Sequence, residues 1–196
     1  MSLIGQKTTT TFFPWETYLS LVAKLERDKN YKFCLLLAVG VNTGLRIGDL
    51  LKLKLSDVMG SDTFKINEGK TGKLRNIKIN KDLREIIDRV IPKYLNTDND
   101  SLLFLNRFGT KAIDKSYVNV KFKEICKYYK IKVDGNISSH TFRKTLGRRI
   151  AEVHNYSDQS FLMLSKLFNH SNTTVTRTYL GITEEEIHDL YDSICI

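Results

Sequence analysis

The run of apolar residues at positions 33–41 constrains the fold more than any other feature of this chain of 196 residues. Nine residues fall far short of the roughly 20 that span a bilayer, so we expect no membrane association. From Tyr31 onward the run is apolar on nearly every side, which predicts a helix buried in a core. Asn42, Thr43 and Gly44 then break that helix. A chain of this length buries roughly 70% of its unfolded surface, so a globular domain built around the run is expected.

The spacing of apolar residues elsewhere predicts more helices than strands. Tyr18, Leu21, Val22 and Leu25 follow Pro14 at helical spacing. Further helices are predicted over residues 45–53, 81–94, 118–129, 140–153, 161–168 and 173–180. Segments 62–68 and 74–79 alternate apolar and polar residues around a Gly-containing loop, which is typical of a β-hairpin. We therefore expect a mainly α fold with a small antiparallel β-sheet, in the α+β class.

Charge is unevenly distributed along the chain. There are 31 Lys and Arg against 22 Asp and Glu, for a net charge of +9. The bases cluster in residues 65–78, 111–132 and 143–149, whereas residues 184–192 carry five acids and no Lys or Arg. Clustered bases of this kind favour a polyanionic partner such as nucleic acid.

Cysteine usage and the N-terminus bear on the compartment. Cys34, Cys126 and Cys195 are odd in number and widely spaced, which predicts reduced thiols rather than disulfides or a zinc site. No charged segment followed by an apolar one opens the chain, so no secretory signal is expected. We expect a cytoplasmic protein.

Three short segments carry residues suited to phosphodiester chemistry. Residues 43–51 contain Arg46, residues 139–145 contain His140 and Arg143, and residues 167–179 contain His170 and Tyr179. Cleaving a phosphodiester requires a nucleophile, cations around the non-bridging oxygens and a proton donor for the leaving oxygen. Arginine suits phosphate because its planar fork binds two oxygens and stays charged. A phenol titrates near pH 10 in water, so a tyrosine nucleophile needs a base or cationic surroundings.

With the hairpin segment 68–73, these segments resemble the signature boxes of the tyrosine recombinases, or phage-type integrases. The resemblance covers about residues 13–182 and implies the fold of that family's catalytic domain. A loose segment over residues 1–12 would precede the domain. An amphipathic tail helix over residues 183–196 would follow it.

The resemblance implies how the reaction would run. Tyr179 would be the nucleophile that forms a 3′-phosphotyrosyl link and frees a 5′-hydroxyl, with no metal, ATP or other cofactor. Arg46 and Arg143 would clamp the scissile phosphate. Lys70 would be the general acid for the leaving 5′-oxygen.

Three more residues would assist at the same site. His140 would help proton transfer at Tyr179, His170 would hydrogen-bond a phosphate oxygen, and Asp49 would brace the site. Further DNA contacts are expected from Lys65, Lys73, Arg75 and Lys144.

One departure from the family pattern lies just before His170, where Asn169 takes the place of the usual glycine. Asn is the non-glycine residue most tolerant of left-handed backbone angles, so we expect the turn to survive.

The partners follow from the same resemblance. The substrate would be a double-stranded DNA recombination site. The protein would bind this site as a homo-oligomer, a tetramer, and would be a monomer without DNA. The tail helix would dock on a neighbouring subunit or pack on its own domain. Typical members carry a further helical domain ahead of this one, so the chain is expected to be either a fragment of a longer integrase or a compact single-domain member.

Two alternatives to a bacterial, phage or mobile-element recombinase stay open. One is a nicking-closing enzyme like the type IB topoisomerases. The other is a DNA-binding regulator with a retired active site, against which every catalytic position is filled.

Overall fold

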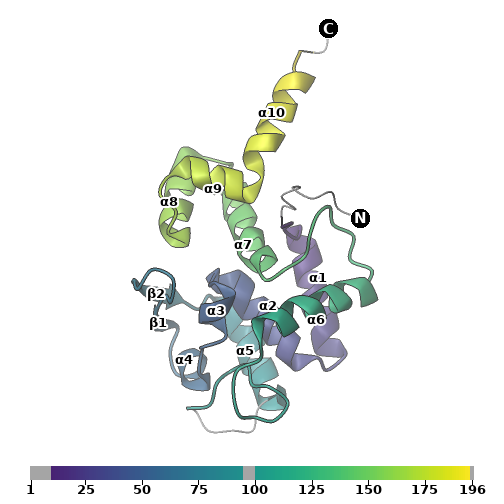
Figure 1. Cartoon of the computed structure of the whole chain (residues 1–196), viewed down its shortest axis with the longest axis vertical. Helices are drawn as coiled ribbons and strands as arrows, with labels where there is room; N and C mark the ends of the chain where they lie inside the picture. Colours follow the sequence, from purple (N-terminus) through teal and green to yellow (C-terminus); the bar gives the residue numbers. More distant parts are fainter. Residues whose placement is uncertain (1–9, 95–99, 195–196) are drawn as a thin grey trace. The chain divides into compact units, whose positions relative to one another are not determined.

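The structure, a computed structural model, describes residues 10–94 and 100–194, apart from the side chains of 183–186 and 190. The chain divides into two compact units, the first ending at Thr145 and the second beginning at Leu146. Most of the predicted loose segment, Cys195 and the charged side chains of residues 184–186 lie outside this description. The elements are α1 (Trp15–Arg27), α2 (Tyr31–Thr43), α3 (Ile47–Leu50), α4 (Leu55–Met59), β1 (Thr63–Asn67), β2 (Leu74–Lys78), α5 (Lys81–Tyr94), α6 (Lys115–Tyr128), α7 (His140–Val153), α8 (Asp158–Phe168), α9 (Thr173–Leu180) and α10 (Ile182–Asp192) (Figure 1).

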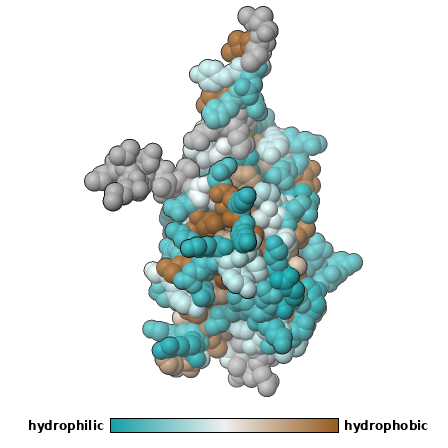
Figure 2. Space-filling view, turned by 90° about the vertical axis from the view of Figure 1, so that its right-hand side faces the viewer, coloured by the Kyte–Doolittle hydropathy of each residue, from teal (hydrophilic) through white to brown (hydrophobic). Residues whose placement is uncertain are grey.

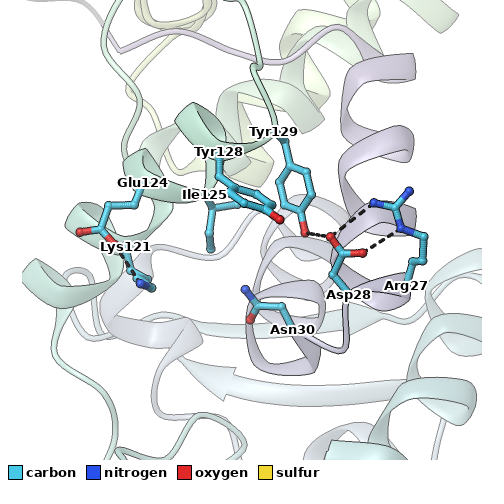
Figure 3. Close-up of a pocket in the computed structure, with 8 residues that line it drawn as sticks. All are labelled: Arg27, Asp28, Asn30, Lys121, Glu124, Ile125, Tyr128 and Tyr129. Atoms are coloured by element: carbon cyan, nitrogen blue, oxygen red, sulfur yellow. Dashed lines mark hydrogen bonds and ion pairs between the residues drawn. The ribbon is translucent and has the colours of Figure 1, made fainter.

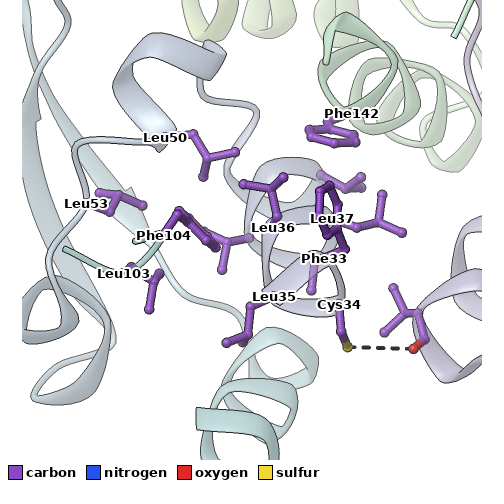
Figure 4. Packing of buried hydrophobic residues seen from close by; sticks show 14 of the residues in the cluster. Phe33, Cys34, Leu35, Leu36, Leu37, Leu50, Leu53, Leu103, Phe104 and Phe142 are labelled. Atoms are coloured by element: carbon purple, nitrogen blue, oxygen red, sulfur yellow. Dashed lines mark hydrogen bonds between the residues drawn. The ribbon is translucent and has the colours of Figure 1, made fainter. Parts of the chain in front are cut away.

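The core of the first unit is built around α2, as the apolar run predicts. Leu35, Leu36 and Leu37 are fully buried, and Figure 4 shows them surrounded by side chains from α3, from α7 and from the segment that includes Leu103 and Phe104. Because α2 is apolar all round, neighbours pack against several of its faces. The helices that pack most extensively against α2 are α5 and α1.

The predicted β-hairpin is present. β1 and β2 form a two-stranded antiparallel sheet in which Phe64 faces Ile77 and Ile66 faces Arg75. Phe64 and Ile77 are buried, so one face of the hairpin packs on the core. The mainly α fold with a small antiparallel sheet is confirmed.

The prediction of a helix over residues 45–53 is wrong in its extent. α3 covers only Ile47–Leu50. Beyond it the backbone bonds to a distant segment instead of continuing the helix: the Leu53 carbonyl accepts from the Leu103 N–H at 2.7 Å. The short helix α4, which the apolar spacing does not signal, begins where the Asp57 carboxylate accepts from the Lys54 N–H.

The second unit has its own small core. Phe161, Leu164 and Phe168 of α8 pack with Leu180 of α9 and with Ile182. Ser157 caps α8 and Asn172 caps α9, each by accepting a hydrogen bond from a backbone N–H in the first turn.

Hydrophilic residues cover most of the face shown in Figure 2, with apolar side chains in small patches. Within residues 10–94 and 100–194, no helix combines the length and apolarity needed to cross a bilayer.

Candidate active site

One pocket of about 450 Å³ in the first unit brings together Arg46, Lys70, His140 and Arg143. Asp49 also lines this pocket. These residues come from α3, the hairpin turn and the start of α7, which are separated by up to 97 positions in the sequence, from 46 to 143. The fold therefore gathers in one place four of the six residues predicted to be catalytic.

Arg46 is placed by the start of α3. It precedes the first helical residue, with an extended backbone, and its carbonyl accepts from the Asp49 and Leu50 N–H groups at 2.9 Å. Its side chain is half-buried, and Nη1 donates to Oε2 of Glu68 at 2.9 Å. The guanidinium is thus fixed by a hydrogen-bonded ion pair rather than left on the surface.

Arg143 lies in the first turn of α7 and is 4% exposed. Its Nη1 donates to the carbonyl oxygen of Gly44. Gly44 ends α2 in the left-handed conformation, with φ 59°, which glycine adopts without strain. The break predicted at residues 42–44 therefore presents the carbonyl that holds Arg143.

His140 is the first residue of α7, where the Ser138 hydroxyl accepts from its backbone N–H at 3.2 Å. Partial desolvation lowers the pKa of its imidazole, and the nearby cations Lys115, Arg143, Lys144 and Arg46 lower that pKa further. Both effects disfavour the charged form, so in the DNA-free protein His140 is poised as a neutral group that can accept a proton.

Lys70 lies in the hairpin turn with an exposed side chain. The turn closes through the Gly72 N–H donating to the Glu68 carbonyl at 2.8 Å, and Gly72 has φ 66°. The Gly69 N–H donates to Oδ1 of Asp49 at 2.8 Å. Asp49, which is 3% exposed, therefore fastens the turn that carries Lys70 to α3.

Glu68 is a residue of this site to which the sequence analysis assigns no role. It is 2% exposed, and Oε2 accepts from both Arg46 Nη1 and Thr71 Oγ1. The sequence does carry one signal for this residue, because Glu68 is the single acid among five bases in residues 65–78.

The four expected DNA contacts are placed unequally. Lys65 and Lys73 on the hairpin are exposed. Arg75 turns inward, with a side chain only 14% exposed, and donates from Nη2 to the Thr43 carbonyl at 2.6 Å. Lys144 is buried, at 7% exposed.

His170 and Tyr179 belong to the second unit, where their rings lie against each other. The ring centroids are 5.1 Å apart at 72°, and Phe168 makes an edge contact with Tyr179 at 5.8 Å. His170 Nδ1 lies 3.0 Å from the Thr176 hydroxyl. Tyr179 is half-buried near the end of α9, and this unit fixes its ring by packing.

The predicted tolerance of Asn169 is confirmed. This residue ends α8 in the left-handed conformation, with φ 55° and ψ 47°. The His170 N–H then donates to the Ser165 carbonyl at 2.9 Å, so the turn fixes the position of the His170 backbone.

A second hollow in the first unit, of about 680 Å³, contains none of the predicted site residues (Figure 3). Figure 3 shows its side chains bonded to one another: the Tyr129 hydroxyl donates to Asp28 at 2.7 Å, and Arg27 donates to the same carboxylate. Among the described residues, no group of three or more His, Cys, Asp or Glu side chains is arranged to hold a metal ion.

Comparison with known proteins identifies the family of the chain. Residues 13–186 match the sequence profile of the phage integrase family. A probable integrase/recombinase of Bacillus subtilis, YoeC, is 28% identical over 165 residues, covering 84% of this chain and 85% of the relative. The tyrosine recombinase XerA of Pyrococcus horikoshii is 31% identical over 161 residues, covering 81% of this chain and 52% of the relative.

Solved structures show the same fold. A crystal structure of XerA recombinase has a TM-score of 0.68 at 19% identity, covering 96% of this chain and 66% of that chain. A lambda integrase dimer bound to a core site has a TM-score of 0.68 at 18% identity, covering 93% of this chain and 51% of that one. At such identities the agreement concerns the fold alone.

The chain belongs to the phage integrase family. The class predicted from the motifs, a tyrosine-type recombinase, is confirmed by this match together with the curated relatives. Apart from YoeC, these relatives are longer, and the chain spans about half the length of XerA.

Proposed function

We propose that this chain is the catalytic domain of a site-specific DNA recombinase that cleaves and rejoins strands through a 3′-phosphotyrosyl link. The observation that carries the proposal is the pocket lined by Arg46, Lys70, His140 and Arg143. Three cations and a neutral imidazole around one cavity suit a phosphate that gains charge in its transition state.

The reaction balances with the groups present. The phenolic oxygen of Tyr179 attacks the phosphorus, the bond from phosphorus to the 5′-oxygen breaks, and Lys70 gives that oxygen a proton. Arg46 and Arg143 stabilise the charge on the non-bridging oxygens, and neutral His140 takes the proton of the phenol. The reverse steps rejoin the strand without an external energy source, because the phosphotyrosyl link conserves the energy of the broken ester.

The substrate would be a double-stranded DNA recombination site. Related structures are titled as complexes with DNA, including XerH with its difH substrate after cleavage and a lambda integrase dimer on a core site. The exposed Lys65 and Lys73 would supply phosphate contacts beside the pocket. Work on DNA would place the protein in the cytoplasm of a bacterial host.

The assembly on DNA would be a tetramer formed from monomers. In the tail, Ile187 and Tyr191 of α10 are exposed, and so is Ile194 just beyond the helix; Tyr191 and Ile194 are 71% and 70% exposed. Such side chains would be covered by a neighbouring subunit. Residues 1–12, 13–182 and 183–196 would act as a loose lead segment, the catalytic domain and this tail.

A covalent adduct assay tests the proposal. The substrate is a nicked duplex made from the DNA that flanks the native gene, incubated in EDTA and resolved under denaturing conditions. The wild-type chain should form an adduct, Tyr179→Phe should form none, and Tyr128→Phe, which changes an exposed tyrosine outside the motifs, should behave as wild type.

The assay also separates the alternatives. An adduct that survives Tyr179→Phe overturns the choice of nucleophile, and one that requires a divalent ion overturns the metal-free reaction. DNA binding with no adduct, from the full-length gene product as well, favours the regulator. Relaxation of supercoiled DNA without sequence preference favours the topoisomerase-like enzyme.

A further inference from the structure

Glu68 is a buried carboxylate inside the most basic part of the chain. Its exposed fraction is 2%, although residues 65–78 carry five bases. A carboxylate is removed from water only at a large cost unless cations and hydrogen bonds compensate it. The groups that compensate the Glu68 carboxylate therefore indicate which part of the site this residue positions.

Two guanidinium groups flank this carboxylate. Oε2 accepts from Arg46 Nη1 at 2.9 Å and from Thr71 Oγ1 at 3.0 Å. Oε1 lies 3.5 Å from Nη1 of Arg75, and Nη2 of the same arginine donates to the Thr43 carbonyl. Glu68 thus joins the hairpin to the segment that carries Arg46.

The carboxylate is ionised at neutral pH. Burial by itself raises its pKa, but the Thr71 hydroxyl and the charges of Arg46 and Arg75 lower the pKa by more, so the net direction is downward. An ionised Glu68 accepts a charge-assisted hydrogen bond from Arg46, which is stronger than one between neutral groups.

We propose that Glu68 is a positioning residue for strand cleavage, holding the Arg46 guanidinium in the orientation that the scissile phosphate requires. This role rests on the function proposed above. A guanidinium has five N–H donors in a rigid plane, so a bond to one nitrogen fixes the plane while the group still faces the pocket. Without that bond a long side chain would have to be ordered during the reaction, and preorganisation would be lost.

The negative charge of Glu68 allows a positioning role to be distinguished from a purely structural one. The carboxylate offsets one cation beside the phosphate pocket, so it weakens the attraction for DNA while it orients Arg46. Removing the charge should leave DNA binding as tight as before or tighter, yet slow cleavage. General damage to the fold would weaken binding and cleavage together.

The experiment compares Glu68→Gln and Glu68→Ala with wild type, using Glu124→Gln as the matched control because Glu124 is an exposed partner of Lys121 outside the pocket. Adduct formation is measured in single turnover. Binding to the same duplex is measured by fluorescence anisotropy in a Tyr179→Phe background. Both Glu68 variants should form adduct at least 10-fold more slowly with an unchanged or lower Kd, and Glu124→Gln should match wild type.

Two further arms show which group Glu68 acts through. Combined with Arg46→Ala, the change Glu68→Gln should cause no additional loss of rate, because the residue that it positions is gone. On a duplex whose scissile 5′-oxygen is replaced by sulfur, the thiolate leaves without a proton donor. There the Lys70→Ala defect should shrink while the Glu68→Gln defect persists.

Each contrary result is decisive. Cleavage by Glu68→Gln at the wild-type rate, a Kd that rises in step with the loss of rate, additivity with Arg46→Ala, or rescue by the sulfur substrate would each overturn the role. Glu68→Gln keeps the shape of the side chain, so its melting curve guards against a folding defect. If neither the wild-type chain nor the full-length gene product forms an adduct, the proposed function itself is overturned, and this role with it.

Discussion

The carboxylate of Asp49 accepts a hydrogen bond from the backbone N–H of Gly69, with 2.8 Å between Oδ1 and N. The bond links α3 to the hairpin turn one residue before Lys70. Asp49 lies three residues after Arg46, so one short segment carries the proposed phosphate ligand and also holds the hairpin turn that carries Lys70. This contact gives a physical basis for the bracing role that the family resemblance assigns to Asp49.

Asp49→Ala should therefore damage both stability and cleavage. A buried hydrogen bond to a charged group contributes about 2 kcal/mol, so the free energy of unfolding should fall by about that amount. The loosened turn should slow single-turnover cleavage by about 10-fold or more, since misplaced catalytic groups are costly. Urea unfolding and the adduct assay measure the two effects.

Asp49→Asn is the matched control, because its amide oxygen can still accept from Gly69. This variant should retain more of the rate than Asp49→Ala. Equal rates for the alanine variant and the wild type would show that the contact does not organise the site.

The close approach of Gly40 to Phe142 yields a prediction about packing. A Cβ built on Gly40 would stand 2.7 Å from Cδ2 of Phe142, and Phe142 directly precedes Arg143. Gly40→Ala should destabilise the fold by about 2 kcal/mol through overpacking, which for a chain of this size lowers Tm by about 4–8 °C. Thermal unfolding followed by circular dichroism measures this.

Gly60→Ala is the control for the same substitution in open space, because a Cβ there meets nothing within 4 Å and φ is −92°. Its Tm should stay level or rise slightly, since alanine restricts the unfolded chain. If both variants melted alike, tight packing at Gly40 would not be the cause.

The parts of the fold that the sequence predicts are those governed by local pattern. The apolar run before Gly44 predicts the buried helix α2, and alternation around the Gly-containing loop predicts the hairpin. Asn is a residue type that favours the position just before a helix, and the Asn80 side chain accepts from the Leu83 N–H at 2.8 Å at the start of α5. These signals depend on neighbours within a few residues.

What the sequence does not predict depends on contacts between distant segments. The early end of α3 follows from backbone bonds between the Leu53 and Leu103 segments. The inward turn of Arg75 follows from the hairpin register and from the Thr43 carbonyl, and the pairing of Glu68 with Arg46 joins positions 22 apart. No periodicity within one element encodes such pairs.

The salt dependence of DNA binding should distinguish Lys73 from Arg75. When a variant binds one phosphate fewer than the wild type, the slope of log K against log salt falls by about 0.9. Lys73→Gln removes an exposed cation and should reduce the slope by that amount. Arg75→Gln changes a largely buried side chain, so it should lower Tm and leave the slope nearly unchanged. A reduced slope for Arg75→Gln would instead make Arg75 a direct DNA ligand.

The pKa of His140 should respond to its cationic neighbours. Partial desolvation and the charges of Lys115, Arg143, Lys144 and Arg46 hold it below the usual 6.5. Lys115→Gln removes one of these charges and should raise the pKa, measured from the Hε1 chemical shift in an NMR titration. Lys121→Gln, which changes a lysine paired with Glu124, should leave it unchanged. A pKa that is unmoved by Lys115→Gln would mean that this lysine does not act on the imidazole.

The sign of the pH effect on stability follows from the same shift. His140 binds a proton more weakly in the folded chain than in the unfolded chain, so protonation favours unfolding. Its contribution to stability is present above pH 6.5, the unfolded value, and is lost as pH falls through the lower folded value. His140→Gln should therefore flatten the acid side of a curve of unfolding free energy against pH. An unchanged curve would argue against the shift.

The left-handed Asn169 before His170 gives the last prediction. A residue with a Cβ costs roughly 1–2 kcal/mol in this conformation, whereas glycine adopts it freely and Asn more easily than most. Asn169→Gly should keep or slightly raise the free energy of unfolding, and Asn169→Ala should lower it by about 1 kcal/mol. Because the turn fixes the position of the His170 backbone, cleavage should slow in the alanine variant and persist in the glycine variant. If glycine slowed cleavage as much as alanine, the Asn169 side chain itself, rather than the backbone angle, would be what His170 requires.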